Sequence, residues 1–175
     1  EFQGVKGIMT WASSKGYVDR IEVLTFVDGG LSIDWMKKAG AKVQNLLTKG
    51  SLNHLSHQLK KTPEQHFAEI AQSIALANKN GIATNVYLED WSNGMRNSPE
   101  YVFQYLDFLV TQPVKRILLP DTLGVLIPSD TFEFISKITA KYPNIHFDFH
   151  AHNDYDLSVA NVMEAVKAGI SGLHV

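Results

Sequence analysis

Two histidines spaced two residues apart, His150 and His152, are the residues of this chain whose types and spacing most directly indicate chemistry. They end a run, residues 145–152, in which apolar and polar side chains alternate. Alternation with a period of two is typical of a β-strand, and residues two apart on a strand point to the same side. The two imidazoles are therefore expected to project together at the end of that strand. Neutral imidazoles held side by side are half of a site for a divalent metal.

The histidine pair alone does not decide between a metal site and two ordinary histidines, because the chain has seven histidines and the spacing also arises by chance. Polar residues at two earlier predicted strand ends make the metal site the better interpretation. The segment ATNVYLED carries Tyr87 and Glu89, and the segment VKRILLPD ends at Asp121, which Thr122 follows. Residues able to do chemistry thus recur where successive strands end.

The composition is that of an ordinary globular domain, with 45% hydrophobic and 19% charged residues in a chain of 175. A formal net charge of −2 gives no sign of a nucleic-acid or anionic-membrane partner. The absence of cysteine excludes disulfides, thiolate ligands and a cysteine nucleophile, and is consistent with a reducing compartment. Without a signal peptide or an apolar segment of membrane-spanning length, the expected location is the cytoplasm.

Strands and helices alternate along the chain. The predicted strands cover residues 20–27, 42–48, 83–90, 114–121, 145–152 and 170–175. The predicted helices cover residues 2–13, 33–39, 62–81, 98–109, 128–139 and 157–168, whereas residues 51–61 are a loop or short helix and residues 91–97 a loop rich in Gly and Asn. This alternation predicts a parallel sheet covered by helices.

Such a sheet is either doubly wound and open or closed into a (β/α)₈ TIM barrel. No glycine-rich phosphate-binding segment follows the first predicted strand, which argues against the doubly wound fold. Polar residues at the C-terminal strand ends favour the barrel, because barrel enzymes keep their sites there. A whole barrel needs eight strands and about 250 residues. We therefore expect residues 1–175 to form one partial TIM-barrel domain of about six βα units, an incomplete barrel in which the first strands and the C-terminal part are absent.

The chain resembles the DRE-TIM metallolyase family. The segments FHAHND and SVAN carry the resemblance, together with LPDTLGV one βα unit earlier. Four further segments, TFVDG, NLLTKGS, NVYLEDWSNG and HNDYDLSVAN, are most similar to the branch of citramalate synthase and 2-isopropylmalate synthase. One departure is the run 155–157, because many relatives have a glycine soon after HND.

The resemblance implies a divalent metal site and an acid/base residue. His150 and His152 match the two metal-binding histidines of the family, for Mn, Mg, Zn or Co. The family completes this site with an aspartate from the first strand and an asparagine beyond the eighth, and neither element is in this chain. Glu89 matches a glutamate beside the metal-bound oxo acid and is the candidate catalytic residue. The alternative for Glu89 is a solvated carboxylate at a strand end.

The same resemblance assigns further residues to the substrate site. Tyr87 is expected as a wall of the pocket, and Thr122 is similar to the residue that binds the substrate carboxylate. Leu24 and Leu47 resemble apolar pocket positions that favour a small oxo acid such as pyruvate, with ordinary core leucines as the alternative. Asn153 is expected either behind the metal ligands or in a turn that caps a helix.

Five other polar residues are expected to have structural or solvent-exposed positions. Asp90 has the opposite parity to Glu89 and should point outward. Asp121 could brace the preceding loop through a hydrogen bond of its carboxylate. His54, His57 and His66 are expected at the surface.

The resemblance implies an acyltransferase that uses acetyl-CoA as co-substrate and a divalent metal. The reaction would be a Claisen condensation with pyruvate or 2-oxoisovalerate, giving a 2-hydroxy diacid for leucine or isoleucine biosynthesis. The alternatives are a lyase or aldolase of the hydroxymethylglutaryl-CoA lyase type and a non-catalytic domain. We expect a homodimer for the full-length protein and no condensation by the 175 residues alone.

Overall fold

A parallel sheet of six strands forms the centre of the protein in a computed structural model that describes residues 2–174. The strands are β1 (Val23–Phe26), β2 (Val43–Lys49), β3 (Ala83–Glu89), β4 (Val114–Asp121), β5 (Phe147–Ala151) and β6 (Gly172–His174). Their order in the sheet is their order in the sequence. A doubly wound sheet would reverse this order at a switch point, whereas successive barrel strands are always neighbours.

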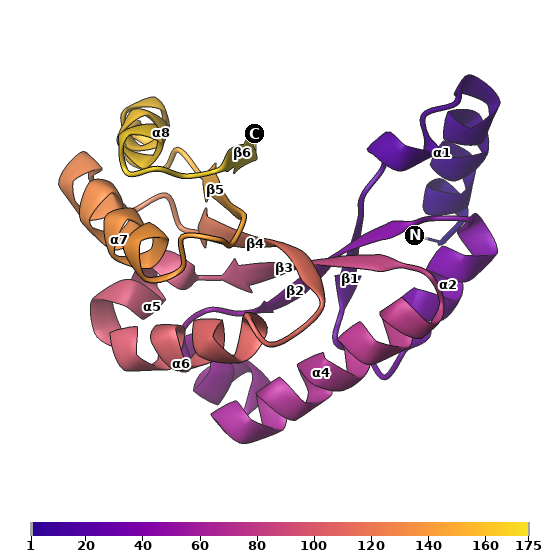
Figure 1. The fold of residues 1–175 in the computed structure, drawn as a ribbon, viewed down its shortest axis with the longest axis horizontal. Helices are drawn as coiled ribbons and strands as arrows, with labels where there is room; N and C mark the ends of the chain where they lie inside the picture. The colour runs from indigo at the N-terminus through magenta and orange to yellow at the C-terminus, as the bar shows by residue number, and fades with distance from the viewer. Residues whose placement is uncertain (1, 175) are drawn as a thin grey trace.

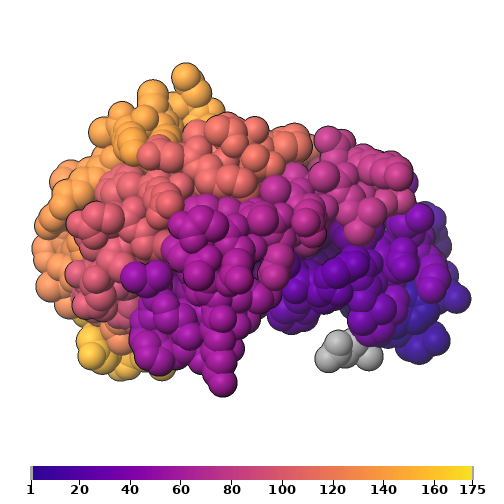
Figure 2. Space-filling model, turned by 90° about the horizontal axis from the view of Figure 1, so that it is seen from below, coloured from indigo at the N-terminus to yellow at the C-terminus, as the bar shows by residue number. Residues whose placement is uncertain are grey.

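Helices cover one side of this sheet. The long ones are α1 (Phe2–Lys15), α2 (Leu31–Ala39), α4 (Pro63–Lys79), α5 (Trp91–Asn97), α6 (Pro99–Leu109), α7 (Pro128–Lys141) and α8 (Ser158–Lys167). Three short turns are η1 (Val18–Arg20), α3 (Leu52–His54) and η2 (Leu55–Leu59). Figure 1 shows α4 to α8 along the convex side of the curved sheet, with α1 and α2 beside β1. Figure 2 shows the indigo N-terminal segment at one end of this arc and the orange and yellow segments, which lead to the C-terminus, at the other.

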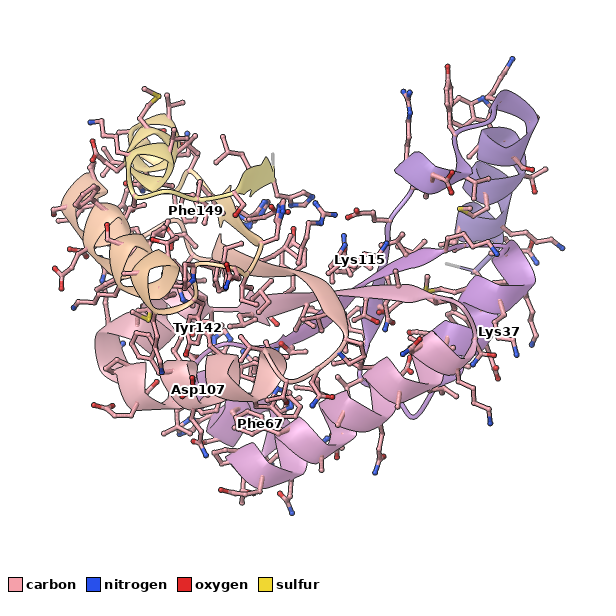
Figure 3. The ribbon with its side chains drawn as sticks, viewed as in Figure 1. Lys37, Phe67, Asp107, Lys115, Tyr142 and Phe149 are labelled. Atoms are coloured by element: carbon pink, nitrogen blue, oxygen red, sulfur yellow. The ribbon has the colours of Figure 1, made fainter. Side chains whose placement is uncertain are left out.

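The main core lies between the sheet and the helices. Alternate strand residues point toward the helices, and Leu46, Leu88, Leu119 and Phe149 among them are fully buried. Figure 3 shows Phe149 on the side of β5 that the helices cover. The intervening residues of each strand must then face the concave side. Within residues 2–174, no helix has the length and apolar character needed to cross a membrane.

Helix α4 begins as predicted, after Thr62. The Thr62 hydroxyl accepts a hydrogen bond from the Gln65 amide at 3.3 Å, and the Gln65 side chain accepts one from the Thr62 amide at 3.0 Å. Such a capping box stabilises a helix start by about 1 kcal/mol. Phe67 then stacks on α6, with ring centroids 5.0 Å from both Tyr105 and Phe108 (Figure 3).

Four predicted elements differ from the structure. The first strand is limited to Val23–Phe26, and the fifth begins at Phe147 rather than at residue 145. The sixth begins at Gly172 rather than at residue 170, and residue 175, its predicted end, lies outside the described residues. The predicted loop 91–97 is helix α5. Its Gly and Asn content suggested a turn, but packing decides the conformation here. Trp91 is fully buried, and Gly94 lies so close to β2 that a Cβ atom on it would be 2.1 Å from the carbonyl oxygen of Gly50.

Candidate active site

The C-terminal strand ends surround a cavity of about 410 Å³ on the concave side of the sheet. Its lining residues are Glu22, Leu24, Asn45, Leu47, Tyr87, Glu89, Pro120, Thr122, His150, His152 and His174. All residues that were predicted for metal binding, catalysis and substrate contact are in this set, except Asn153. Their joint position follows from strand parity, while their individual roles stay predictions.

Strand register explains why these side chains meet. Parallel pairing places Leu47 of β2 opposite Tyr87 of β3, and His150 of β5 opposite His174 of β6. Neighbouring residues in a parallel register point to the same face, so each pair forms a row across the concave side. Five of the six strands, β2 to β6, therefore each place a side chain in the same row as His150 or in the row two residues closer to the start of the strands.

The histidine pair lies with its two rings side by side, at the end of β5 and just beyond it. The rings of His150 and His152 have centroids 4.9 Å apart. The Nδ1 atom of His150 lies 3.0 Å from the carbonyl oxygen of His174. Because a carbonyl can only accept, Nδ1 must carry the ring proton, and Nε2 of the neutral ring has a free lone pair. A backbone carbonyl commonly orients metal-binding histidines in this way.

The electrostatics of His150 also favour the neutral form. Burial is the main cause that lowers its pKa, and the neighbouring His174 and His152 lower it further, while the hydrogen bond to the His174 backbone acts in the opposite direction. A neutral imidazole is the form that binds metal. Among residues 2–174, no three His, Cys, Asp or Glu side chains are grouped to hold an ion, and the metal-binding role of the pair stays a prediction.

His174 is a cavity residue that the sequence reasoning missed. Its Nδ1 atom is hydrogen-bonded to the Tyr87 hydroxyl and lies 3.1 Å from Nδ1 of His150. Burial and, secondarily, the charge of Asp148 raise the pKa of Tyr87 to about 12, so the phenol keeps its proton and donates it. Parity along the predicted strand 170–175 was a signal that could have found His174.

Glu89 lies at the end of β3 and forms an ion pair with Lys49 of β2. The two residues are direct partners in the strand register. The Glu89 side chain is 23% exposed and contributes to the cavity wall. This carboxylate is therefore partly enclosed and paired, unlike the freely solvated strand-end carboxylate that was the alternative.

Asp90 faces away from the cavity, as its parity predicts, but the expectation that it points outward is wrong. It is buried, with a positive φ of 65°. Its carboxylate accepts hydrogen bonds from Ser51 at 2.6 Å and Asn93 at 2.8 Å, and His54 Nε2 lies 3.4 Å away. Its amide donates to the Thr122 hydroxyl oxygen at 2.8 Å. This hydrogen bond fixes the Thr122 oxygen, and Thr122 also lines the cavity.

Asp121 braces the loop that follows it rather than the loop that precedes it. Its fully buried carboxylate accepts from the Leu126 amide at 2.9 Å and from the Ser92 hydroxyl at 2.8 Å. The prediction named the wrong loop, because the segment that folds back onto the end of β4 is the one after residue 122. The Asp121 side chain thereby joins the β4–α7 loop to α5.

The prediction that His66 lies at the surface is also wrong. It is only 1% exposed, and its Nε2 atom accepts a hydrogen bond from the Lys49 amide at 3.2 Å. Burial lowers its pKa to about 4. The signal was its spacing of four from Ile70, which places both on the inner side of α4. His54 is largely buried as well, with its side chain 16% exposed, whereas His57 is exposed as predicted.

Asn153 has the contacts of a helix cap. Its Oδ1 atom accepts from the Ser158 amide at 3.0 Å, and its Nδ2 atom donates to Asp156 at 3.2 Å. Of the two expectations for Asn153, these contacts correspond to the capping turn before α8. Asn153 is not among the residues given above as the lining of the cavity.

Comparison with known proteins assigns this chain to a family. The model of the HMGL-like family matches residues 18–175, which include all six strands. The chain belongs to the HMGL-like family. The resemblance to DRE-TIM metallolyases is thereby confirmed.

The sequence relatives of this HMGL-like chain include homocitrate synthases. The protein of Saccharolobus islandicus (strain L.S.2.15 / Lassen #1) is 36% identical over 128 residues, which cover 69% of this chain and 26% of the relative. The homocitrate synthase of Sulfolobus acidocaldarius is 31% identical over 121 residues, covering 69% and 25%. The chain thus matches about a quarter of the length of these relatives.

Solved structures of HMG-CoA lyases share the fold. The enzyme of Pseudomonas aeruginosa has a TM-score of 0.76 at 16% identity, covering 87% of this chain and 51% of the lyase chain. The Bacillus subtilis enzyme has a TM-score of 0.75 at 19% identity, covering 87% and 51%. At these identities the likeness establishes the fold alone, and it confirms the predicted partial TIM barrel.

Proposed function

We propose that this chain is part of a metal-dependent acyltransferase that condenses acetyl-CoA with a 2-oxo acid. The observation that carries the proposal is the single cavity that brings His150, His152, Glu89 and Thr122 together. Relatives named homocitrate synthase, up to 36% identical, support a synthase. The lyase structures are too distant in sequence to support the reverse reaction.

His150 and His152 would hold the divalent ion through their Nε2 atoms, together with ligands from outside residues 2–174. When bound, such an ion acts as a Lewis acid toward the ketone of the oxo acid. Thr122 would donate its hydroxyl proton to the substrate carboxylate, because it lines the cavity and the hydrogen bond from the Asp90 amide holds its oxygen in place while leaving the O–H able to donate. Tyr87 would form the wall beside His150 and hold His174 in place.

Glu89 would act as the base. Its carboxylate would take a proton from the methyl group of acetyl-CoA, and the methyl carbon would form a bond to the ketone carbon of the oxo acid. The ketone oxygen becomes a hydroxyl by taking up a proton. Water then hydrolyses the thioester, which releases CoA and leaves a 2-hydroxy diacid.

Leu24 and Leu47 would limit the size of the oxo acid. Both side chains border the cavity beside Tyr87. Two leucines leave room for a small group such as the methyl of pyruvate, and each extra methylene changes selectivity by about 1–3 kcal/mol. The proposal therefore favours pyruvate over 2-oxoisovalerate, in isoleucine or leucine biosynthesis respectively, with the full-length protein acting as a cytoplasmic homodimer.

The test is release of CoA from acetyl-CoA by the full-length protein. Mn²⁺ or Mg²⁺ would be supplied with pyruvate, 2-oxoisovalerate or 2-oxoglutarate in turn, beside the variant His150→Ala/His152→Ala. We expect metal-dependent release with one acid that the variant loses. Absence of release with every acid would refute the synthase, and cleavage of hydroxymethylglutaryl-CoA in the same preparation would identify a lyase.

A further inference from the structure

We propose that Lys49 is a positioning residue that holds the Glu89 carboxylate in its place at the cavity. The proposal rests on the function of Glu89 proposed above. Lys49 Nζ forms an ion pair with Glu89 Oε2, and the two side chains are 14% and 23% exposed. Of the basic groups in residues 2–174, Lys49 is the one paired with Glu89.

Hydrogen bonds hold the backbone of Lys49 and of the residue that follows it. Its amide donates to Nε2 of the buried His66 at 3.2 Å, and its carbonyl accepts from the Tyr101 hydroxyl at 2.8 Å. The next amide, of Gly50, donates to the Glu89 carbonyl at 2.7 Å. An exposed ion pair contributes little because two free side chains must be ordered to form it. Here both side chains are largely enclosed on adjacent, fixed backbones, so less side-chain entropy is lost when they pair.

Close packing at Gly50 supports this rigidity. A Cβ atom there would lie 2.5 Å from the carbonyl oxygen of Leu88, so β2 and β3 approach each other more closely than any residue but glycine allows. The strand ends that carry Lys49 and Glu89 are therefore held at a short, defined separation. This is the geometry in which an ammonium group can restrict a carboxylate to one position.

Lys49 acts through Glu89 rather than on the substrate. Glu89 contributes to the cavity wall, whereas Lys49 lies outside the described lining set. Removal of the ammonium group would leave a partly enclosed carboxylate without its counter-charge, which is costly, and the side chain would turn toward solvent. A base displaced by about 1 Å can lose on the order of a hundredfold in rate.

The first test is steady-state kinetics of the full-length protein with the oxo acid that it uses. Lys49→Met should lower kcat by about 10- to 100-fold and change KM for the oxo acid by less than about threefold. Lys49→Arg should restore most of kcat, because the guanidinium keeps the charge. Lys42→Met, an exposed lysine just before the same strand, is the matched control and should behave as wild type.

Three kinetic outcomes would overturn the positioning role. Unchanged kinetics in Lys49→Met would show that Glu89 needs no partner. A raised KM with an unchanged kcat would make Lys49 a substrate-binding residue instead. Failure of Lys49→Arg to restore kcat would show that the charge is not what matters.

A second measurement separates this proposal from the proposed function. Thermal unfolding of Lys49→Met, Glu89→Gln and the double variant needs no substrate. We expect Lys49→Met to lower Tm by about 3 °C when Glu89 is present and by less than half of that in Glu89→Gln. If wild type releases no CoA, the synthase is refuted, and additive Tm shifts would then refute the ion pair as well, whereas non-additive shifts would support it.

Discussion

Protonation of His66 should destabilise the protein as the pH falls, and this follows from three features of its site. The ring is buried, its Nε2 atom accepts a hydrogen bond from the Lys49 amide, and its Nδ1 atom has no partner among residues 2–174. A protonated ring would carry a proton on each nitrogen, so Nε2–H would face the Lys49 N–H and the hydrogen bond would be lost.

The magnitude follows from the pKa of His66, which burial lowers from its ordinary value of 6.5 to about 4, with Glu69 opposing the effect. The unfolded chain takes up this proton as the pH falls through 6.5, while the folded protein does not until about 4. The stability that neutral His66 supports is therefore complete above 6.5 and is lost progressively as the pH falls toward 4. The loss amounts to about 3 kcal/mol at its lower end.

The assay is urea unfolding of wild type and of His66→Gln at several pH values between about 4 and 7.5. Glutamine can offer an oxygen to the Lys49 amide but takes up no proton, so it removes the titration and keeps an acceptor. The free energy of unfolding of wild type minus that of His66→Gln should fall by about 3 kcal/mol as the pH falls, because all other titrating groups cancel. His57→Gln, at an exposed position, is the matched control and should follow wild type.

Parallel curves for wild type and His66→Gln would refute this account of His66. So would a difference that grows as the pH falls, because it would mean that the folded protein binds the proton more readily than the unfolded chain. A shallower fall for His57→Gln than for His66→Gln would make His57, rather than His66, the sensitive histidine.

Three further predictions concern packing and the cavity. Gly94→Ala should lower the free energy of unfolding in urea by about 3 kcal/mol, because its Cβ would clash with the backbone of Gly50. Gly4→Ala has open space and should be neutral or slightly stabilising, and equal effects of the two substitutions would contradict the close contact at Gly94. Phe149→Ala should cost about 3–5 kcal/mol in the same assay, and a cost below about 1 kcal/mol would mean that Phe149 is not part of the core. Thr122→Val should raise KM for the oxo acid about tenfold while Thr122→Ser stays near wild type; equal KM values would exclude the hydroxyl as a donor.

Much of the cavity could be predicted from the sequence because strand parity is a rigid geometric rule. Once residues 83–90 and 145–152 are read as strands of one parallel sheet, Tyr87, Glu89, His150 and His152 must share a face at one edge. The sequential strand order follows from the regular alternation of strand and helix. These inferences need only the period of the pattern, which is visible in one sequence.

The features that the sequence did not reveal depend on contacts between distant segments. Helix α5 forms because Trp91 and Gly94 pack against β2 and the core, although its local composition suggests a loop. Asp90 is buried because Ser51 and Asn93 satisfy its carboxylate. A polar side chain reads as exposed unless its partner is known, and such partners lie tens of residues away.

The same contacts join the cavity side of the sheet to the helical layer behind it. Glu89 and Asp90 are consecutive and therefore of opposite parity, so one carboxylate borders the cavity and the other is buried on the side of the helices. Behind them, His66 on α4 fixes the backbone of Lys49, whose side chain pairs with Glu89. A substitution at His66, which does not line the cavity, should therefore change kcat as well as stability. Loss of stability in His66→Ala with an unchanged kcat would show that the two layers act independently.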